Sequence, residues 1–140
     1  MLYFDSSTVV CMLSGEERTE EILSWFSELE PTDLCMSDWN IAEFYSAMSF
    51  KRRTGQLTAE QRQNAEMLFE AYLKDYFQVL SLSSADFRRA ASIAGRDDIN
   101  IRASDALHLA VAEAHGAAIC TLDKKMNQAA GIIGVDCLMP

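Results

Sequence analysis

The stretch that decides the fold is residues 2–7, which read Leu-Tyr-Phe-Asp-Ser-Ser. Three apolar or aromatic residues followed by a carboxylate and two hydroxyls predict a short buried strand that ends on Asp5. Ser6 and Ser7 are helix-capping residues, and they precede a predicted helix over residues 8–13. In an open parallel sheet, ligands bind beyond the carboxyl ends of the strands. Asp5 therefore lies where we expect chemistry.

The remaining chain alternates short apolar runs with longer amphipathic stretches. The runs predict strands at residues 34–36, 77–80, 117–122 and 134–138. The amphipathic stretches predict helices at residues 16–30, 39–53, 59–76, 84–94, 103–115 and 124–130. Strands that alternate with helices predict an α/β fold in which helices cover both faces of a parallel sheet. No linker or repeat divides the 140 residues, so we expect a single domain over residues 1–140.

Two long helices near the middle of the chain are predicted to form a hairpin. Thr54-Gly55-Gln56 ends the helix over residues 39–53. Thr58, with Gln61 three residues later, is a capping-box pattern that begins the next helix. A short turn between two such helices makes them an antiparallel pair.

The composition is that of a soluble globular protein, with 49% hydrophobic and 24% charged residues. No apolar run approaches the ~20 residues of a membrane span, and we expect no signal peptide. The four cysteines form no Cys-X-X-Cys pair, which favours reduced thiols in a cytoplasmic protein over a zinc site or disulfides. The net charge of −9 disfavours nucleic-acid binding, except that carboxylates holding metal ions are neutralised when the site is filled.

Four carboxylates are placed to meet at one edge of the predicted sheet. Asp5 and Asp123 each follow a predicted strand directly. Glu43 lies in the first half of the helix over residues 39–53, and Asp105 lies in the first turn of its own helix. If the first and fourth strands are neighbours, Asp5 and Asp123 lie side by side.

A cluster of this kind needs a cation. Two carboxylates ~5 Å apart repel each other by roughly 3 kcal/mol at an effective dielectric constant of ~20. Four together raise their own pKa values unless a positive ion lies among them. Hard oxygen ligands without histidine or cysteine indicate Mg²⁺ or Mn²⁺, and such ions suit phosphoryl chemistry because they activate water and stabilise the leaving oxygen.

Each carboxylate also has a simpler interpretation. Asp5 and Asp123 are suited to capping the helices that follow them. Asp105 is suited to a favourable interaction with a helix dipole, and Glu43 to exposure on a helix surface. The joint interpretation is favoured by the apolar or small neighbours of these acids, as in Ile-Ala-Glu43-Phe and Ala-Ser-Asp105-Ala-Leu.

Four pieces of the sequence resemble the PIN-domain nucleases, and most closely the VapC-type toxins of bacterial toxin–antitoxin pairs. They are Leu-Tyr-Phe-Asp5-Ser-Ser, Asn40-Ile-Ala-Glu43, residues 101–117 around Asp105, and Ile-Cys-Thr121-Leu-Asp123-Lys-Lys-Met. The resemblance covers the whole chain and its length. It implies a three-layer α/β/α fold with a parallel sheet of five strands, and cleavage of RNA that depends on Mg²⁺ or Mn²⁺.

The resemblance also implies residue roles and partners. Asp5, Glu43, Asp105 and Asp123 match the acidic quartet of the family, and no acid of the quartet is replaced. Ser6 and Thr121 match hydroxyl positions that support the first and last acids. The family further implies a homodimer and a small VapB-like antitoxin. The helical hairpin is the expected partner surface, although its apolar residues Met67, Leu68 and Tyr72 also suit an ordinary core.

Other functional assignments stay open at this point. A non-catalytic α/β domain that binds a metal or partner, or a phospho-acceptor domain in signalling, is the alternative to a nuclease. His108 and His115 have no partner at metal-ligand spacing, so structural or surface roles are favoured for both. Arg102 suits a substrate phosphate or an ion pair with a nearby acid. For an RNA substrate we expect a local basic rim drawn from Arg52, Arg53, Arg102 and Lys124.

Overall fold

The residues that the computed structural model describes, 1–30 and 33–140, contain a five-stranded parallel sheet. Its strand order is β3-β2-β1-β4-β5, with β1 at the centre. The strands are β1 (Leu2–Phe4), β2 (Leu34–Ser37), β3 (Gln78–Leu80), β4 (Ala118–Cys120) and β5 (Cys137–Leu138). The predicted α/β fold is confirmed. The last three strands are shorter than predicted, because apolar residues such as Phe77 and Ala117 are buried beside the strands without belonging to them.

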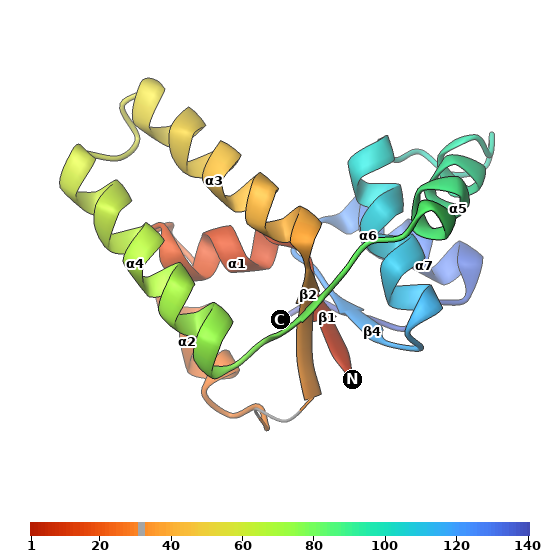
Figure 1. The fold of residues 1–140 in the computed structure, drawn as a ribbon, viewed down its shortest axis with the longest axis horizontal. Coiled ribbons are helices and arrows are strands. Elements are labelled where there is room, and N and C mark those ends of the chain that lie inside the picture. Colours follow the sequence, from red (N-terminus) through yellow and green to blue (C-terminus); the bar gives the residue numbers. More distant parts are fainter. Residues whose placement is uncertain (31–32) are drawn as a thin grey trace.

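Helices cover both faces of this sheet, which gives the predicted three layers (Figure 1). The helices of one face are α1 (Ser6–Leu13), α2 (Thr19–Phe26), α3 (Asp38–Arg53) and α4 (Ala59–Asp75). Those of the other face are α5 (Ser84–Ala94), α6 (Ala103–Ala114) and α7 (Lys124–Ile133). No helix in residues 1–30 and 33–140 is both long and apolar enough to cross a bilayer.

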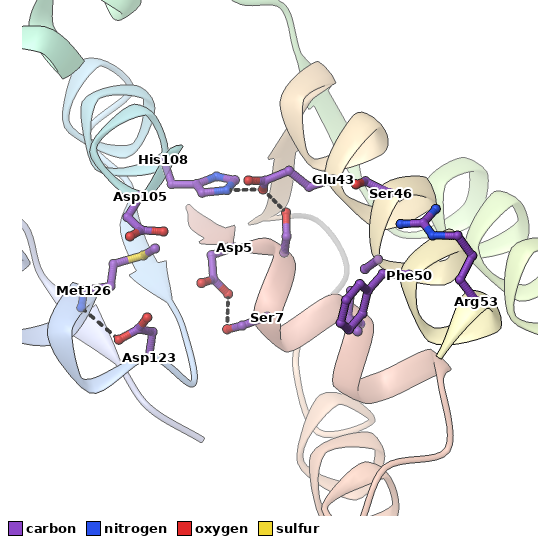
Figure 2. Close-up of a pocket in the computed structure, with 13 residues that line it drawn as sticks. Asp5, Ser7, Glu43, Ser46, Phe50, Arg53, Asp105, His108, Asp123 and Met126 are labelled. Atoms are coloured by element: carbon purple, nitrogen blue, oxygen red, sulfur yellow. Dashed lines mark hydrogen bonds and ion pairs between the residues drawn. The ribbon is translucent and has the colours of Figure 1, made fainter. Parts of the chain in front are cut away.

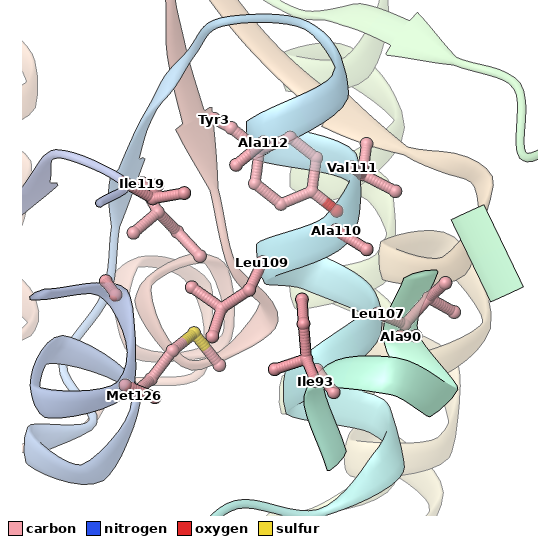
Figure 3. Packing of buried hydrophobic residues seen from close by; sticks show 14 of the residues in the cluster. Tyr3, Ala90, Ile93, Leu107, Leu109, Ala110, Val111, Ala112, Ile119 and Met126 are labelled. Atoms are coloured by element: carbon pink, nitrogen blue, oxygen red, sulfur yellow. The ribbon is translucent and has the colours of Figure 1, made fainter. Parts of the chain in front are cut away.

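Consecutive side chains along each strand point to opposite faces of the sheet, so the buried residues form two hydrophobic cores, one on each face. Tyr3 packs with α5, α6 and α7, whereas its neighbour Phe4 packs with α1, α2, α3 and α4. In β4, Ile119 and Cys120 divide in the same way. Figure 3 shows Tyr3 and Ile119 beside α6, which contributes apolar residues all along its length. A strand buried on both faces needs apolar residues at every position, and residues 2–4 satisfy this.

The helical hairpin is formed by α3 and α4, and it projects away from the sheet (Figure 1). Its two helices are joined at their base by stacking of Phe44 on Phe69, whose ring centroids are 3.9 Å apart. The predicted capping box of Thr58 and Gln61 is confirmed at the start of α4. In the middle of α4, Met67 and Leu68 are 64% and 48% exposed.

Helix α2 is shorter than the predicted helix over residues 16–30. Glu16 lies in a turn before α2 and forms an ion pair with Lys51 of α3, at 2.8 Å. After Phe26 the backbone closes i to i+3 hydrogen bonds, in which the N–H of Leu29 donates to the carbonyl of Phe26. The regular α-helix therefore ends at Phe26, although Leu29 beyond it still packs against the core.

Candidate active site

The four carboxylates that the sequence singles out line one cavity of about 540 Å³, here called the acidic cavity (Figure 2). Each comes from a different element. Asp5 follows β1, Glu43 projects from α3, Asp105 lies in the first turn of α6, and Asp123 precedes α7. β1 and β4 are neighbours with Phe4 opposite Cys120, so the chain segments that follow them leave the sheet at the same edge.

Asp5 is 2% exposed and is held by three hydroxyls and one backbone N–H. Its Oδ1 accepts hydrogen bonds from the N–H of Thr8 at 3.1 Å and from Ser7 Oγ at 2.7 Å. Its Oδ2 accepts one from Thr121 Oγ1 at 2.8 Å. Asp5 is thus the N-cap of α1, and the prediction that Ser6 or Ser7 caps this helix is wrong. The side chain of Asp5 therefore both caps α1 and lines the acidic cavity.

Asp123 also caps a helix while it faces the cavity. Its Oδ1 accepts from the backbone N–H of Lys125 at 2.7 Å, at the start of α7. Thr121 links this acid to Asp5, since its hydroxyl accepts from the N–H of Asp123 at 2.9 Å and donates to Asp5. The predicted supporting position of Thr121 therefore joins the first and last acids.

Glu43 is fixed by two donors. His108 Nε2 lies 2.6 Å from Glu43 Oε2, and Ser6 Oγ donates to the same oxygen. Ser6 thus contacts Glu43, whereas Ser7 contacts Asp5. Burial opposes ionisation of Glu43, but the hydrogen bonds from His108 and Ser6 outweigh burial and lower the pKa of this carboxyl.

A buried network holds His108 in place. Its Nδ1 lies 2.8 Å from the hydroxyl of Tyr3, and that hydroxyl donates its one proton to Asn40 Oδ1 at 2.9 Å. The amide of Asn40 donates to the carbonyl of Phe4 at 2.9 Å, which ties the network to the central strand. Because a carboxylate oxygen only accepts hydrogen bonds, the Nε2 that faces Glu43 carries a proton when Glu43 is ionised.

His108 is the main residue that sequence reasoning missed. It is 2% exposed and lines the acidic cavity, so a surface role is wrong, whereas His115 is exposed. A signal was present, because His108 lies three residues after Asp105 and such residues share one face of a helix. The supporting roles of Tyr3 and Asn40 had no comparable signal, since they depend on how α6 and α3 pack around β1.

Asp105 lies at the start of α6, half-buried beside other acids. Its Oδ2 accepts from the N–H of Arg102 at 3.2 Å. Burial raises the pKa of the Asp105 carboxyl, and the negative charges of Asp123 and Glu43 add to the rise. Repulsion of this kind favours any cation that enters the cavity.

Comparison with known families identifies the fold. The model of the PIN domain matches residues 2–132 of the chain. The chain belongs to the PIN domain family. The matched residues include all four acids. The five-stranded parallel sheet described above agrees with the fold that the sequence resemblance to PIN-domain nucleases implies. Comparison with curated proteins finds none that matches.

Solved structures of low sequence identity share the fold of this PIN domain. FitAcB from Neisseria gonorrhoeae is 18% identical, with a TM-score of 0.71, and the match covers 99% of this chain and 96% of that one. VapC20 of Mycobacterium tuberculosis, a sarcin-ricin loop cleaving toxin, is 16% identical with a TM-score of 0.71, over 92% and 95%. VapBC2 from Rickettsia felis, bound to a promoter DNA fragment, is 17% identical with a TM-score of 0.71, over 99% and 98%.

The donor set of the PIN domain suits a hard divalent ion. All four donors are carboxylates facing one cavity, and the ion pairs found in residues 1–30 and 33–140 join none of them to Lys or Arg. In the described part of the chain, no three His, Cys, Asp or Glu side chains converge closely enough to chelate an ion as they stand. Ion binding therefore requires small side-chain rotations or bridging waters, which Mg²⁺ commonly retains.

The raised pKa of Asp105 predicts that its replacement stabilises the PIN domain. The folded pKa lies above the unfolded one, so the ionised carboxyl lowers the free energy of unfolding at pH 7. We expect Asp105→Asn to melt at a higher temperature than the native protein at pH 7 in EDTA. The difference should shrink as the pH falls through the folded pKa and vanish below the ordinary value, where both states are protonated.

This prediction has a matched control. Asp97→Asn makes the same chemical change in an exposed turn and should leave the melting temperature nearly unchanged. Thermal unfolding of the three proteins, followed by circular dichroism between pH 7 and pH 3, makes the comparison. An Asp105→Asn protein less stable than the native one at pH 7 would contradict the repulsion inferred for this cavity.

Proposed function

We propose that this PIN domain is an endoribonuclease that hydrolyses RNA phosphodiester bonds with a divalent metal ion, and that it acts as the toxin of a toxin–antitoxin pair. The observation that carries the proposal is the convergence of Asp5, Glu43, Asp105 and Asp123 on one cavity of a PIN domain. Support comes from the solved relatives, which include a toxin named for cleaving the sarcin-ricin loop.

Asp5, Asp105 and Asp123 would hold the principal ion, Mg²⁺ or Mn²⁺, and Glu43 would assist it or a second ion. Such an ion supplies a water of lowered pKa and neutralises charge on the leaving oxygen of the phosphodiester. Ser7 and Thr121 keep the carboxylate of Asp5 in one orientation. His108 and Ser6 keep Glu43 ionised and directed into the cavity. The protein thus supplies a negatively charged site at the sheet edge.

The proposed partners are an RNA substrate, a VapB-like antitoxin and a second copy of the chain in a cytoplasmic homodimer. Solved relatives such as VapBC2 of Rickettsia felis are toxin–antitoxin complexes. The exposed side chains of Met67 and Leu68 on the hairpin are consistent with a partner surface there. Tyr72 is different, since it is partly buried and packs against the core, with its ring 5.5 Å from that of Phe26.

The test is cleavage of a pool of labelled structured RNAs by the purified protein, with Mg²⁺, with Mn²⁺ and with EDTA. We expect internal cleavage with either ion, none in EDTA, and recovery when the ion is restored. Induced expression of the native protein should arrest bacterial growth. If the protein binds RNA or metal but cleaves no RNA under any of these conditions, the result would favour the alternative of a non-catalytic α/β binding domain.

His108 is expected to act as a positioning residue for Glu43. His108→Ala removes the donor to Glu43 and should lower kcat by about tenfold or more, the range typical of groups that orient metal ligands. His108→Gln restores an N–H at similar reach and should recover part of kcat. The KM for RNA should change little in both variants, and the exposed His115→Ala should behave as the native protein. Equal losses in the Ala and Gln variants would argue for a purely structural role.

A further inference from the structure

A second cavity adjoins the acidic cavity and shares two of its acids. It has a volume of about 550 Å³ and is here called the polar cavity. Asp105 and Asp123 line both cavities, so the two hollows meet at these carboxylates. Beyond them, the polar cavity is lined by Arg102 and Lys125, together with Asn100, Ser104 and Ile101.

The cations that line the two cavities are free of ion pairs. Arg53 lines the acidic cavity, and Arg102 and Lys125 line the polar cavity. None of the three forms a salt bridge in residues 1–30 and 33–140, whereas Arg96 is already paired with Asp98 at 2.6 Å. Arg52 and Lys124 also form no salt bridge in these residues, so Arg53, Arg102 and Lys125 are singled out by their place on the cavity walls. In a protein of net charge −9, cations on both sides of an acidic site supply local positive charge for an anionic ligand.

The far end of the acidic cavity offers an aromatic surface. Phe50 lines it with a side chain that is 53% exposed, and Arg53 follows one turn later on α3. Figure 2 shows both side chains on α3 beyond Glu43, on the side away from Asp105 and Asp123. An exposed ring beside a guanidinium group suits an unstacked base and its phosphate.

We propose that single-stranded RNA crosses the site from the acidic cavity into the polar cavity, with the scissile phosphate at the shared acids. Arg102 and Lys125 bind the phosphates on one side, and Arg53 binds a phosphate on the other. A base stacks on Phe50. A duplex does not fit this scheme, because its bases are stacked on one another and present no face to Phe50. The inference rests on the proposed function, since it assigns the path of the same substrate.

The chain provides adjacent matched controls for the charges. Arg52 and Lys124 are exposed, like Arg53 and Lys125, but neither lines the acidic cavity or the polar cavity. In the Asp5→Asn background, where RNA is bound without being cut, we would measure the Kd of a labelled single-stranded RNA at several salt concentrations. Each of Arg53→Gln, Arg102→Gln and Lys125→Gln should lower the slope of log K against log salt by about 0.7, the value for one phosphate contact on a single strand. Arg52→Gln and Lys124→Gln should leave the slope unchanged.

The aromatic contact has its own control. Phe87 on α5 is 51% exposed, nearly as much as Phe50, and lies in neither cavity. Phe50→Ala should weaken binding of the single strand by about tenfold, within the range for loss of one stacked base. Phe87→Ala should not, and a duplex of the same sequence should bind more weakly to the native surface than the single strand.

The outcomes separate this inference from the proposed function. Equal effects of the cavity variants and their controls, or tighter binding of the duplex, would overturn the RNA path even if the native protein cleaves RNA. The expected difference between Arg53 and Arg52, and between Lys125 and Lys124, would support the path even if no cleavage is detected.

Discussion

Asp5→Asn is expected to reduce RNA cleavage on the order of 10²–10³-fold, the loss typical when one preorganised electrostatic group is removed from an active site. The substitution removes the negative charge and keeps the shape. The fold should survive, because the amide oxygen of Asn can still accept from the N–H of Thr8 and cap α1. The loss should appear in kcat, and it should persist at saturating Mg²⁺ or Mn²⁺.

Initial rates on a defined RNA substrate, with thermal unfolding of the same preparation, measure both parts of this prediction. Asp97→Asn, the same change in an exposed turn, is the matched control and should retain native activity. Cleavage by the Asp5→Asn protein at the native rate would remove Asp5 from the proposed site. A loss of activity together with a large fall in melting temperature would identify Asp5 as a structural cap only.

Phe4→Ala is expected to lower the free energy of unfolding by about 3–5 kcal/mol, the usual cost of removing a large buried aromatic side chain. Phe4 is fully buried in the central strand and packs on Phe26 and Phe77, with ring centroids 5.8 Å and 5.1 Å away. Because small domains are stable by only ~5–15 kcal/mol, this change removes a large share of the total.

Urea denaturation followed by circular dichroism measures this effect. Phe4→Leu keeps most of the buried volume and should give a smaller loss. Phe87→Ala, at an exposed site, should change the free energy of unfolding by no more than about 0.5 kcal/mol. If Phe4→Ala were as stable as Phe87→Ala, the core described for α1 to α4 would be wrong.

Much of the fold could be predicted from the sequence, because the apolar runs and helix caps are local signals. The end of β1 at Asp5 and the capping box of Thr58 are examples. Strand lengths were harder to predict, since Phe77 and Ala117 are buried without belonging to a strand. The strand order also lay beyond local patterns, because it depends on how distant segments pair.

The site was predictable to the extent that its acids follow strands or begin helices. The neighbouring positions of Asp5 and Asp123 follow from pairing of β1 with β4. The contact of His108 with Glu43 could not be derived in this way, since it joins two helices that are far apart in the sequence.

The basic residues show a sharper limit. Consecutive residues on a helix point in directions about 100° apart, as 3.6 residues make one turn. Which member of a basic pair faces a cavity therefore depends on the packing of the helix. Arg53 and Arg102 of the predicted basic rim line the cavities, but Arg52 and Lys124 do not, and Lys125 takes the place of Lys124.

The most direct test of the central claim follows metal binding and RNA cleavage in one titration. Mn²⁺ is added to the metal-free protein, bound ion is measured by electron paramagnetic resonance, and the cleavage rate is measured at each concentration. We predict that occupancy and rate rise together in the native protein, and that Asp5→Asn weakens binding and lowers the rate on the order of 10²–10³-fold. Native cleavage that proceeds at full rate with no bound ion would contradict the proposal that the four carboxylates act through a metal.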